Sequence, residues 1–146
     1  EFKLAEEFVK KYEPYLEENL RESCKHFNLA RIHFERGNYK ESLRELLKVD
    51  FAQDPFYSLN SKVLLLKNYY ELQESDAFDS LCSSFKEFIR KNKIVSNEHK
   101  VYSLNFVKTI KKMYQSSPSR LKRLHKEIQQ NYQIVEKGWL LEKSQV

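Results

Sequence analysis

The chain is almost free of glycine, with two glycines and three prolines among its 146 residues. Tight hairpin turns need residues that adopt positive φ, and phosphate-binding loops need several closely spaced glycines. A many-stranded β fold and a glycine-rich phosphate loop are therefore excluded, and we expect an all-α chain. A chain of this length buries roughly two-thirds of the surface that it exposes when unfolded, which suffices for a core without disulfides or metals.

Apolar residues recur at helical spacing along the sequence, and specific residues mark where the helices begin and end. Pro14 ends the first helix, and Gly37 separates the second from the third. Asp54 and Ser96 are expected to cap the helices that follow them, because their side chains can accept hydrogen bonds from free backbone N–H groups. Gly138 is expected to break the last helix. We predict a leading helix at about 2–13, helix pairs at about 18–48, 55–92 and 97–136, and a C-terminal segment at 137–146.

Two of these pairs repeat a common pattern. The run Leu29-Ala30-x-x-His33-Phe34-x-x-Gly37-Asn38-Tyr39-x-x-Ser42-Leu43 aligns with Leu65-Leu66-x-x-Tyr69-Tyr70, and Ser80-Leu81 falls where Ser42-Leu43 does if two residues are inserted at the turn. The offset from position 29 to position 65 is 36 residues. The pattern resembles the tetratricopeptide repeat, whose period is roughly 34 residues. Ser42 stands where that repeat has alanine, Leu66 where it has a small residue and Gln73 where it has the turn glycine.

The resemblance implies an all-α architecture of about seven helices, in which antiparallel helix pairs stack as a right-handed α-solenoid. Such arrays act as non-catalytic scaffolds for protein-protein interaction, and the first helix of each pair lines the concave surface. The segments 50–57 and 139–143 also resemble the C-terminal part of uncharacterised bacterial proteins built from these repeats. We therefore expect one helical-repeat domain over residues 1–146, as a fragment of a longer protein.

A partner-binding surface follows from the repeat alignment. Arg31 and Lys67 occupy equivalent positions, the rings of Phe34 and Tyr70 come one turn later, and Lys108 continues the row if the third repeat keeps this register. Cations beside aromatic rings suit a protein or peptide with acidic or C-terminal carboxylate groups. The alternative is that Phe34 and Tyr70 fill the core, where helically spaced aromatic residues usually lie. The predicted groove residues are Phe27, Arg31, Phe34, Lys67, Tyr70 and Lys108; reversing the charges of Arg31 and Lys67 is expected to abolish binding without lowering stability.

Positive charge is concentrated in the C-terminal half of the chain. From Arg90 to Lys126 there are eleven Lys and Arg against one acid, Glu98, whereas the whole chain has a formal charge of +5. A basic segment attracts nucleic acid through its phosphates, so nucleic-acid binding is the alternative function, and a solvated helix face is the alternative to any role. The predicted basic patch comprises Lys100, Lys111, Lys112, Arg120, Lys122 and Arg123.

Catalytic and metal-binding motifs are missing from the sequence. Cys24 and His26 are two residues apart, which turns them to different faces of a helix, and His26 and His33 do not have the i, i+4 spacing of a helical metal pair. We therefore expect no enzyme activity, no metal and no cofactor. Cys24 and Cys82 are expected to be buried reduced thiols, which favours a cytoplasmic location.

Two further expectations concern membranes and self-association. The longest apolar run is residues 63–66, far shorter than the roughly 20 residues that cross a bilayer, so no membrane span is predicted. The leading helix at about 2–13 carries Ala5, Phe8 and Val9 on one face. In the isolated chain this apolar face is expected to be exposed or to mediate self-association.

Overall fold

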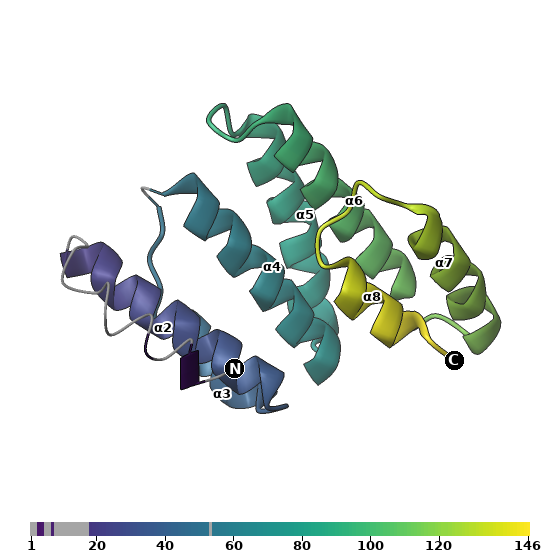
Figure 1. Cartoon of the computed structure of the whole chain (residues 1–146), viewed down its shortest axis with the longest axis horizontal. Coiled ribbons are helices and arrows are strands. Elements are labelled where there is room, and N and C mark those ends of the chain that lie inside the picture. Colours follow the sequence, from purple (N-terminus) through teal and green to yellow (C-terminus); the bar gives the residue numbers. More distant parts are fainter. Residues whose placement is uncertain (1–2, 5–6, 8–17, 53) are drawn as a thin grey trace. The chain divides into compact units, whose positions relative to one another are not determined.

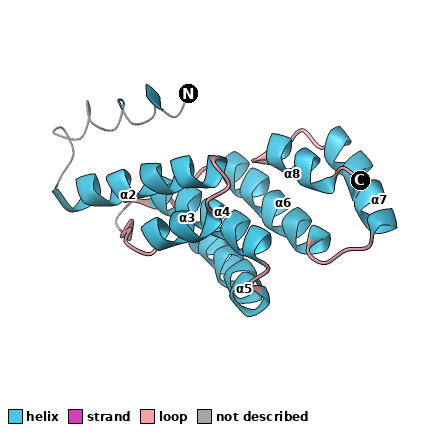
Figure 2. Ribbon diagram, turned by 90° about the horizontal axis from the view of Figure 1, so that it is seen from below, coloured by secondary structure: helices cyan, strands magenta, loops and turns pink. Residues whose placement is uncertain are grey.

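The computed structural model of the chain describes residues 3–4, 7, 18–52 and 54–146. Every regular element in these residues is an α-helix, and loops join the helices (Figure 1, Figure 2). The prediction of an all-α chain is therefore confirmed for the part that the structure describes. The helices are α2 (Glu18–Glu35), α3 (Tyr39–Leu46), α4 (Pro55–Leu72), α5 (Ser75–Lys91), α6 (Asn97–Met113), α7 (Pro118–Gln130) and α8 (Lys137–Ser144).

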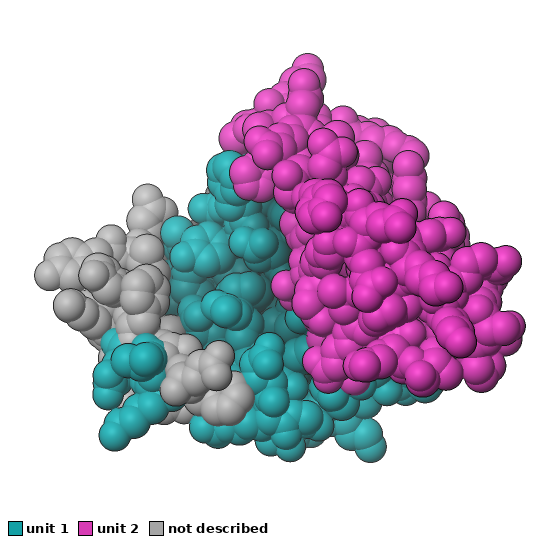
Figure 3. Space-filling model, turned by 45° about the vertical axis from the view of Figure 1, so that its right-hand side comes forward, with its two compact units in different colours: residues 1–78 teal, residues 79–146 magenta. Residues whose placement is uncertain are grey.

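The chain divides into two compact units, which we name unit 1 (Glu1–Phe78) and unit 2 (Asp79–Val146) (Figure 3). Helices α2, α3 and α4 belong to unit 1, and α6, α7 and α8 belong to unit 2. The stacking of all helix pairs into one solenoid domain stays a prediction. The predicted leading helix at 2–13, with its self-association, lies outside the described residues except for positions 3–4 and 7, which are helical.

The helix starts follow from capping side chains. The Asp54 carboxylate accepts hydrogen bonds from the backbone N–H groups of Phe56 and Tyr57, both at 3.1 Å, at the beginning of α4. The Ser96 hydroxyl accepts the N–H of His99 at 3.3 Å at the beginning of α6. Each cap satisfies a donor that has no partner within its own helix. Both predicted caps are confirmed.

The end of α7 differs from the prediction. The helix ends at Gln130 rather than near residue 136, and Gly138 lies inside α8 instead of breaking a helix. The side chain of Asn131 accepts the backbone N–H of Gln133 at 2.9 Å, and Glu136 has a left-handed backbone with φ of 58°. Asn side chains that bond to nearby N–H groups compete with the helical hydrogen bond. The loop 131–136 therefore replaces the expected last turns of the helix, and its Ile134 is buried.

Helices α2 and α4 end in the same kind of turn. Gly37 and Gln73, 36 positions apart, both adopt left-handed backbones, with φ of 79° and 58°. In each turn this residue donates its N–H to the carbonyl three positions earlier, and the following residue donates to the carbonyl five positions earlier, over 2.8 to 3.3 Å. This is the Schellman pattern that satisfies carbonyl groups at a helix end. The repeated turn matches the repeat seen in the sequence.

In unit 1, α2 and α3 pack as an antiparallel pair. The Ser42 hydroxyl donates to the Ala30 carbonyl oxygen at 2.7 Å, and His26 Nδ1 lies 2.6 Å from Glu45 Oε2. As the position on α3 increases from 42 to 45, the partner on α2 moves back from 30 to 26, so the helices run in opposite directions.

Helix α4 runs in the same direction as α2. Near its beginning, the Tyr57 ring lies edge-on to Phe27 with centroids 6.3 Å apart. Further along, the Lys67 ammonium lies over the Phe34 ring. The Asn68 amide donates to the Ser42 hydroxyl at 2.9 Å, which joins α4 to α3. These polar and aromatic contacts connect three helices of unit 1, whose core also contains aliphatic residues such as Ile32, Leu46 and Leu66.

In unit 2, hydrogen bonds join α6 and α8 to α7 and to the loop that follows it. Asn105 of α6 donates its side-chain amide to the Gln133 carbonyl oxygen at 2.8 Å, and His125 Nδ1 of α7 lies 2.9 Å from the Ser144 hydroxyl of α8. The core of unit 2 is apolar and includes the fully buried residues Cys82, Phe85, Ile89, Phe106, Val107, Ile110 and Leu140.

Candidate functional site

Three of the predicted groove residues are buried in unit 1. Phe27 and Phe34 belong to the core, and Lys67 is only 5% exposed. The Lys67 ammonium lies 4.6 Å from the centroid of the Phe34 ring, which also packs edge-on against Tyr39 at 5.1 Å. The structure thus brings Phe34 and Lys67 together, but inside the protein. Phe34 therefore fills the core, which was the alternative to a ligand-facing position.

The other unit 1 residues of the predicted groove have different positions. Arg31 is exposed, and Tyr70 is half-buried with its ring 6.3 Å from that of Phe78. The burial of Lys67 argues against the expectation that a charge reversal there leaves stability unchanged, because the reversal would place a carboxylate in a buried position over a ring face. Only Arg31 can carry such a test.

Lys108 lies in unit 2, where it lines a hollow of about 170 Å³ between α6 and α7 that is partly open to solvent. Lys112, one of the predicted basic residues, lines the same hollow one helical turn further along α6. Both lysines are exposed, and neither forms an ion pair among the described residues. By contrast, Arg90 and Lys91 both pair with Glu87, at 3.7 and 3.5 Å.

The rest of the basic patch is spread over the surface of unit 2. Lys100 is half-buried, and the other five members are exposed. Lys111 lies close enough to the buried Cys82 thiol to favour its thiolate, which places Lys111 toward α5. None of the arginines and lysines of α7 lines the hollow. The structure therefore gathers Lys108 and Lys112 at one site and leaves Lys100, Lys111, Arg120, Lys122 and Arg123 outside it.

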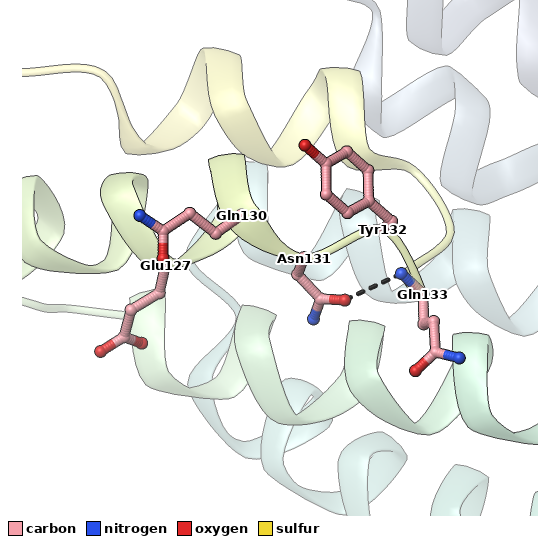
Figure 4. Close-up of a pocket in the computed structure, with 5 residues that line it drawn as sticks. All are labelled: Glu127, Gln130, Asn131, Tyr132 and Gln133. Carbon is pink, nitrogen blue, oxygen red and sulfur yellow. Dashed lines mark hydrogen bonds between the residues drawn. The ribbon is translucent and has the colours of Figure 1, made fainter.

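A second and larger hollow, of about 570 Å³, lies at the end of α7 and opens broadly to solvent. It is lined by one tyrosine and by residues with amide or carboxylate groups, whose side chains project from α7 and the following loop (Figure 4). Glu127 and Asn131 line both hollows, so the two are parts of one surface feature. We name it the α6–α7 groove; its larger hollow is formed by Glu127, Gln130, Asn131, Tyr132 and Gln133.

Tyr132 contributes an aromatic ring to this groove, and 82% of its surface is exposed to solvent. The ammonium of Lys137 lies 4.4 Å from the centroid of its ring and donates a hydrogen bond to the Gln129 carbonyl oxygen at 3.0 Å. In Figure 4 the Tyr132 ring points away from the side chains of Asn131 and Gln133. One face of the ring is held by Lys137, and the side chain extends into solvent.

The site residues predicted from the sequence did not include Asn105, Glu127, Asn131 or Tyr132. The seventh helix was expected to continue to about residue 136, and this expectation hid the loop that carries Tyr132. The signal that could have located the loop is the run of amide side chains Gln129, Gln130, Asn131 and Gln133, although Tyr132 and Val135 continue the apolar spacing from Ile128. Asn is typical of the turn that follows a helix.

The buried thiols and imidazoles do not form a reactive cluster. Burial raises the pKa of the Cys82 thiol to about 11, although Lys111 and Lys86 oppose this effect. Burial also raises the pKa of Cys24, and its hydrogen bond with Tyr57 helps to raise the tyrosine pKa to about 12. These thiols therefore stay protonated near neutral pH, whereas a nucleophile needs the thiolate. Among the described residues, no three His, Cys, Asp or Glu side chains gather as metal ligands would.

Comparisons of this chain with protein-family models, with curated proteins and with solved structures yield no match. In the described parts of the chain, every helix is too short or too polar to cross a bilayer. The geometry of the α6–α7 groove is therefore the basis for a functional conclusion.

Proposed function

We propose that this chain is a non-catalytic protein-interaction module that binds an acidic peptide segment of a partner protein in the α6–α7 groove. The observation that carries the proposal is the pair Lys108 and Lys112, which are exposed, lack ion-pair partners among the described residues and line the same hollow. An ammonium group pairs with a carboxylate through a charge-assisted hydrogen bond, which is stronger than a neutral one.

The dimensions of the hollow favour a side chain of a larger ligand over a whole small molecule. Pockets for drug-sized ligands and cofactors usually occupy roughly 300–1,000 Å³ and have mostly apolar linings. The smaller hollow measures about 170 Å³ and is lined by Asn105, Lys108, Thr109 and Lys112 on the α6 side. A space of this size and polarity suits acidic side chains of a peptide rather than a whole small molecule.

Amide side chains along the groove suit a peptide backbone, which offers both N–H donors and carbonyl acceptors. Asn131 Oδ1 already accepts the Gln133 N–H, and Asn105 Nδ2 already donates to the Gln133 carbonyl oxygen. These bonds hold the two amides in place. The remaining atoms, Asn131 Nδ2 and Asn105 Oδ1, supply one donor and one acceptor for a ligand backbone.

Glu127 favours a peptide over a nucleic acid. Glu127 lines both hollows, so a continuous row of phosphates along the groove would meet the like charge of its carboxylate. A peptide places acids only where cations receive them. The exposed cations of residues 90–126 are the observation that supports nucleic-acid binding as the second candidate.

The resemblance to tetratricopeptide repeats supports the same function. Such a repeat requires an antiparallel helix pair followed by a helix that is parallel to the first helix of the pair. Unit 1 has this arrangement, and the same left-handed turn occurs twice, 36 residues apart. By the same pairing α6 is the first helix of the third pair, the helix that presents ligand-facing side chains in these arrays. We propose that the chain is a cytoplasmic repeat module of this type.

A charge-reversal experiment with a matched control tests the proposal. Random twelve-residue peptides displayed on phage are selected on the purified chain, and the best binders are synthesised with a fluorescent label. We expect enrichment of Asp and Glu, and at least a tenfold loss of affinity in the variant Lys108→Glu/Lys112→Glu. The control Lys122→Glu/Arg123→Glu changes the charge equally on exposed residues outside the groove, and we expect less than a threefold loss.

The same assay decides between the two candidates. A labelled single-stranded RNA of twenty uridines is titrated under identical conditions at several salt concentrations. Tighter binding of this RNA than of any selected peptide, with a steep salt dependence and equal losses in both variants, would replace the peptide proposal by nucleic-acid binding. Selection of peptides without acidic residues would also overturn it.

A further inference from the structure

We infer that the α6–α7 groove recognises a two-part motif: two acidic residues separated by one residue, which pair with Lys108 and Lys112, and an aromatic residue at a fixed spacing, which stacks on Tyr132. This inference rests on the proposed function and adds the chemistry of the partner to it. It makes Tyr132 a specificity-determining residue.

The acidic half of the motif follows from helix and strand geometry. Lys108 and Lys112 are four residues apart on α6, so their backbone positions are separated by about 6 Å along the helix axis. In an extended peptide, side chains on the same face are two residues apart, which corresponds to roughly 6.6 Å. Acidic residues at positions i and i+2 of the peptide therefore match the two lysines.

Glu127 limits how far the acidic run can extend. Because Glu127 lines both the lysine-lined hollow and the hollow that contains Tyr132, its carboxylate would repel a third acidic residue in this direction. The position of the peptide next to Glu127 should be neutral or basic. A long acidic tract is therefore a poorer ligand than a short acidic pair.

The aromatic half of the motif follows from the environment of Tyr132. Tyr132 is 82% exposed, so its ring contributes little to the core of the protein. Tyrosines are frequent anchors of protein interfaces. Lys137 lies over one ring face and is itself held by the Gln129 carbonyl oxygen. This contact orders the ring before binding, which lowers the entropy cost of association.

The cation also selects what stacks on the open face. An ammonium group draws ring electron density toward itself, so the opposite face repels an electron-rich aromatic ring less strongly. A second cation on that face would be repelled by Lys137. The ring therefore favours an aromatic side chain such as tryptophan over a lysine or an arginine.

A panel of labelled peptides tests the motif. Each peptide contains Glu-Ala-Glu and one tryptophan, separated by zero to six alanine or glycine residues in either order, and reference peptides lack the tryptophan or the glutamates. Affinities are measured by fluorescence anisotropy for the unmodified chain, Tyr132→Ala, Tyr132→Phe and Lys108→Glu/Lys112→Glu. Circular dichroism confirms that each variant remains folded.

We expect one spacing at which tryptophan strengthens binding about five- to tenfold. Tyr132→Ala should abolish this gain, whereas Tyr132→Phe, which keeps the ring, should retain it. The peptide without tryptophan should bind Tyr132→Ala as well as it binds the unmodified chain. Such a cycle isolates the coupling between the two rings.

Two outcomes separate failure of the inference from failure of the proposed function. If glutamates strengthen binding through Lys108 and Lys112 but tryptophan adds nothing at any spacing, or adds equally in Tyr132→Ala, the two-part motif is wrong and the proposed function stands. If the glutamates add nothing in any peptide, the proposed function is wrong as well.

Discussion

Both units have polar contacts between their elements, but only unit 2 also has two unpaired cations along a groove among the described residues. In unit 1, side chains of three helices bond to one another across the helix interfaces, as in the contacts of Ser42 with Asn68 and of His26 with Glu45. In unit 2, Lys108 and Lys112 line an open groove and have no ion-pair partner among the described residues. The charges differ as well: twelve Lys and Arg against fifteen Asp and Glu give unit 1 a charge of −3, and fourteen against six give unit 2 a charge of +8.

The difference separates residues that hold the fold from residues available to a partner. Buried polar contacts fix how helices pack, so changes at these positions should alter the free energy of unfolding. Exposed unpaired cations contribute little to stability, so changes there should alter binding instead. Far-UV circular dichroism follows both units, and the fluorescence of Trp139, the single tryptophan, follows unit 2. Substitutions within each unit therefore test this contrast.

The largest effect is expected for Lys67→Glu. The substitution places a carboxylate in a buried position over the negative face of the Phe34 ring and should lower the free energy of unfolding by about 3 kcal/mol or more. Urea denaturation followed by circular dichroism measures the change. Arg31→Glu makes the same change in charge at an exposed position and should shift stability by less than about 0.5 kcal/mol. Equal effects of the two variants would contradict the assignment of Lys67 to the interior.

A smaller effect is expected for Ser42→Ala, although alanine is the residue that the repeat pattern usually has at this position. Without the hydroxyl, one N–H of the buried Asn68 amide loses its partner, which should cost about 2 kcal/mol. The double variant Ser42→Ala/Asn68→Leu removes both polar groups. It should regain much of the stability, because paired polar groups replaced by apolar ones leave no unsatisfied donor. Additive losses in the double variant would show that the two side chains act independently.

Sequence reasoning anticipated the helices because their determinants are local. Apolar spacing, the Asp54 and Ser96 caps and Gly37 at a left-handed turn each act within a few residues, and the structure has helices where these signals placed them. The predicted end of α7 was wrong because a local hydrogen bond ends the helix early. The competing hydrogen bond of Asn131 depends on a side-chain geometry that helical spacing does not reveal.

The predicted site was less accurate, because surface exposure depends on packing between helices. The alignment placed Lys67 on a ligand-facing row, but its direction depends on how α4 packs against α2, and it lies over Phe34. Lys108 was named in the same row and does line a hollow. The other side of that hollow is formed by Leu124, Glu127, Ile128 and Asn131, and helical spacing along α6 cannot predict these neighbours.

The contact between His26 and Glu45 predicts a dependence of stability on pH. Burial alone would raise the pKa of Glu45, but hydrogen bonds from His26 and Lys48 outweigh it and hold the pKa below the ordinary value of 4.5. A carboxylate with a lowered pKa in the folded state stabilises the protein above its unfolded pKa, and this contribution disappears as the pH falls through the folded pKa. We expect a loss on the order of 1 kcal/mol, the usual size for one hydrogen bond, as the pH falls below about 4.5.

The control for this prediction is Glu45→Gln, which keeps the shape of the side chain but cannot titrate. The variant should be less stable than the unmodified chain at pH 7, and the difference should shrink between pH 5 and pH 3. Urea denaturation at each pH, followed by circular dichroism, gives both curves. A difference that stays constant over this range would show that Glu45 contributes through packing rather than charge.

The smallest effect is expected at the left-handed turns, which both units contain. Gln73 in unit 1 and Gln115 in unit 2 have φ of 58° and 55°, a conformation that glycine adopts without steric strain. Gln73→Gly and Gln115→Gly should each raise stability by about 0.5 kcal/mol, since the relief of strain exceeds the greater flexibility that glycine gives the unfolded chain. Gln115→Gly should shift the Trp139 fluorescence transition, whereas Gln73→Gly should shift the circular dichroism transition and leave the fluorescence transition in place. If Gln73→Gly moves both transitions together, the two units unfold in one cooperative step. The two units would then differ in their polar contacts but not in their unfolding.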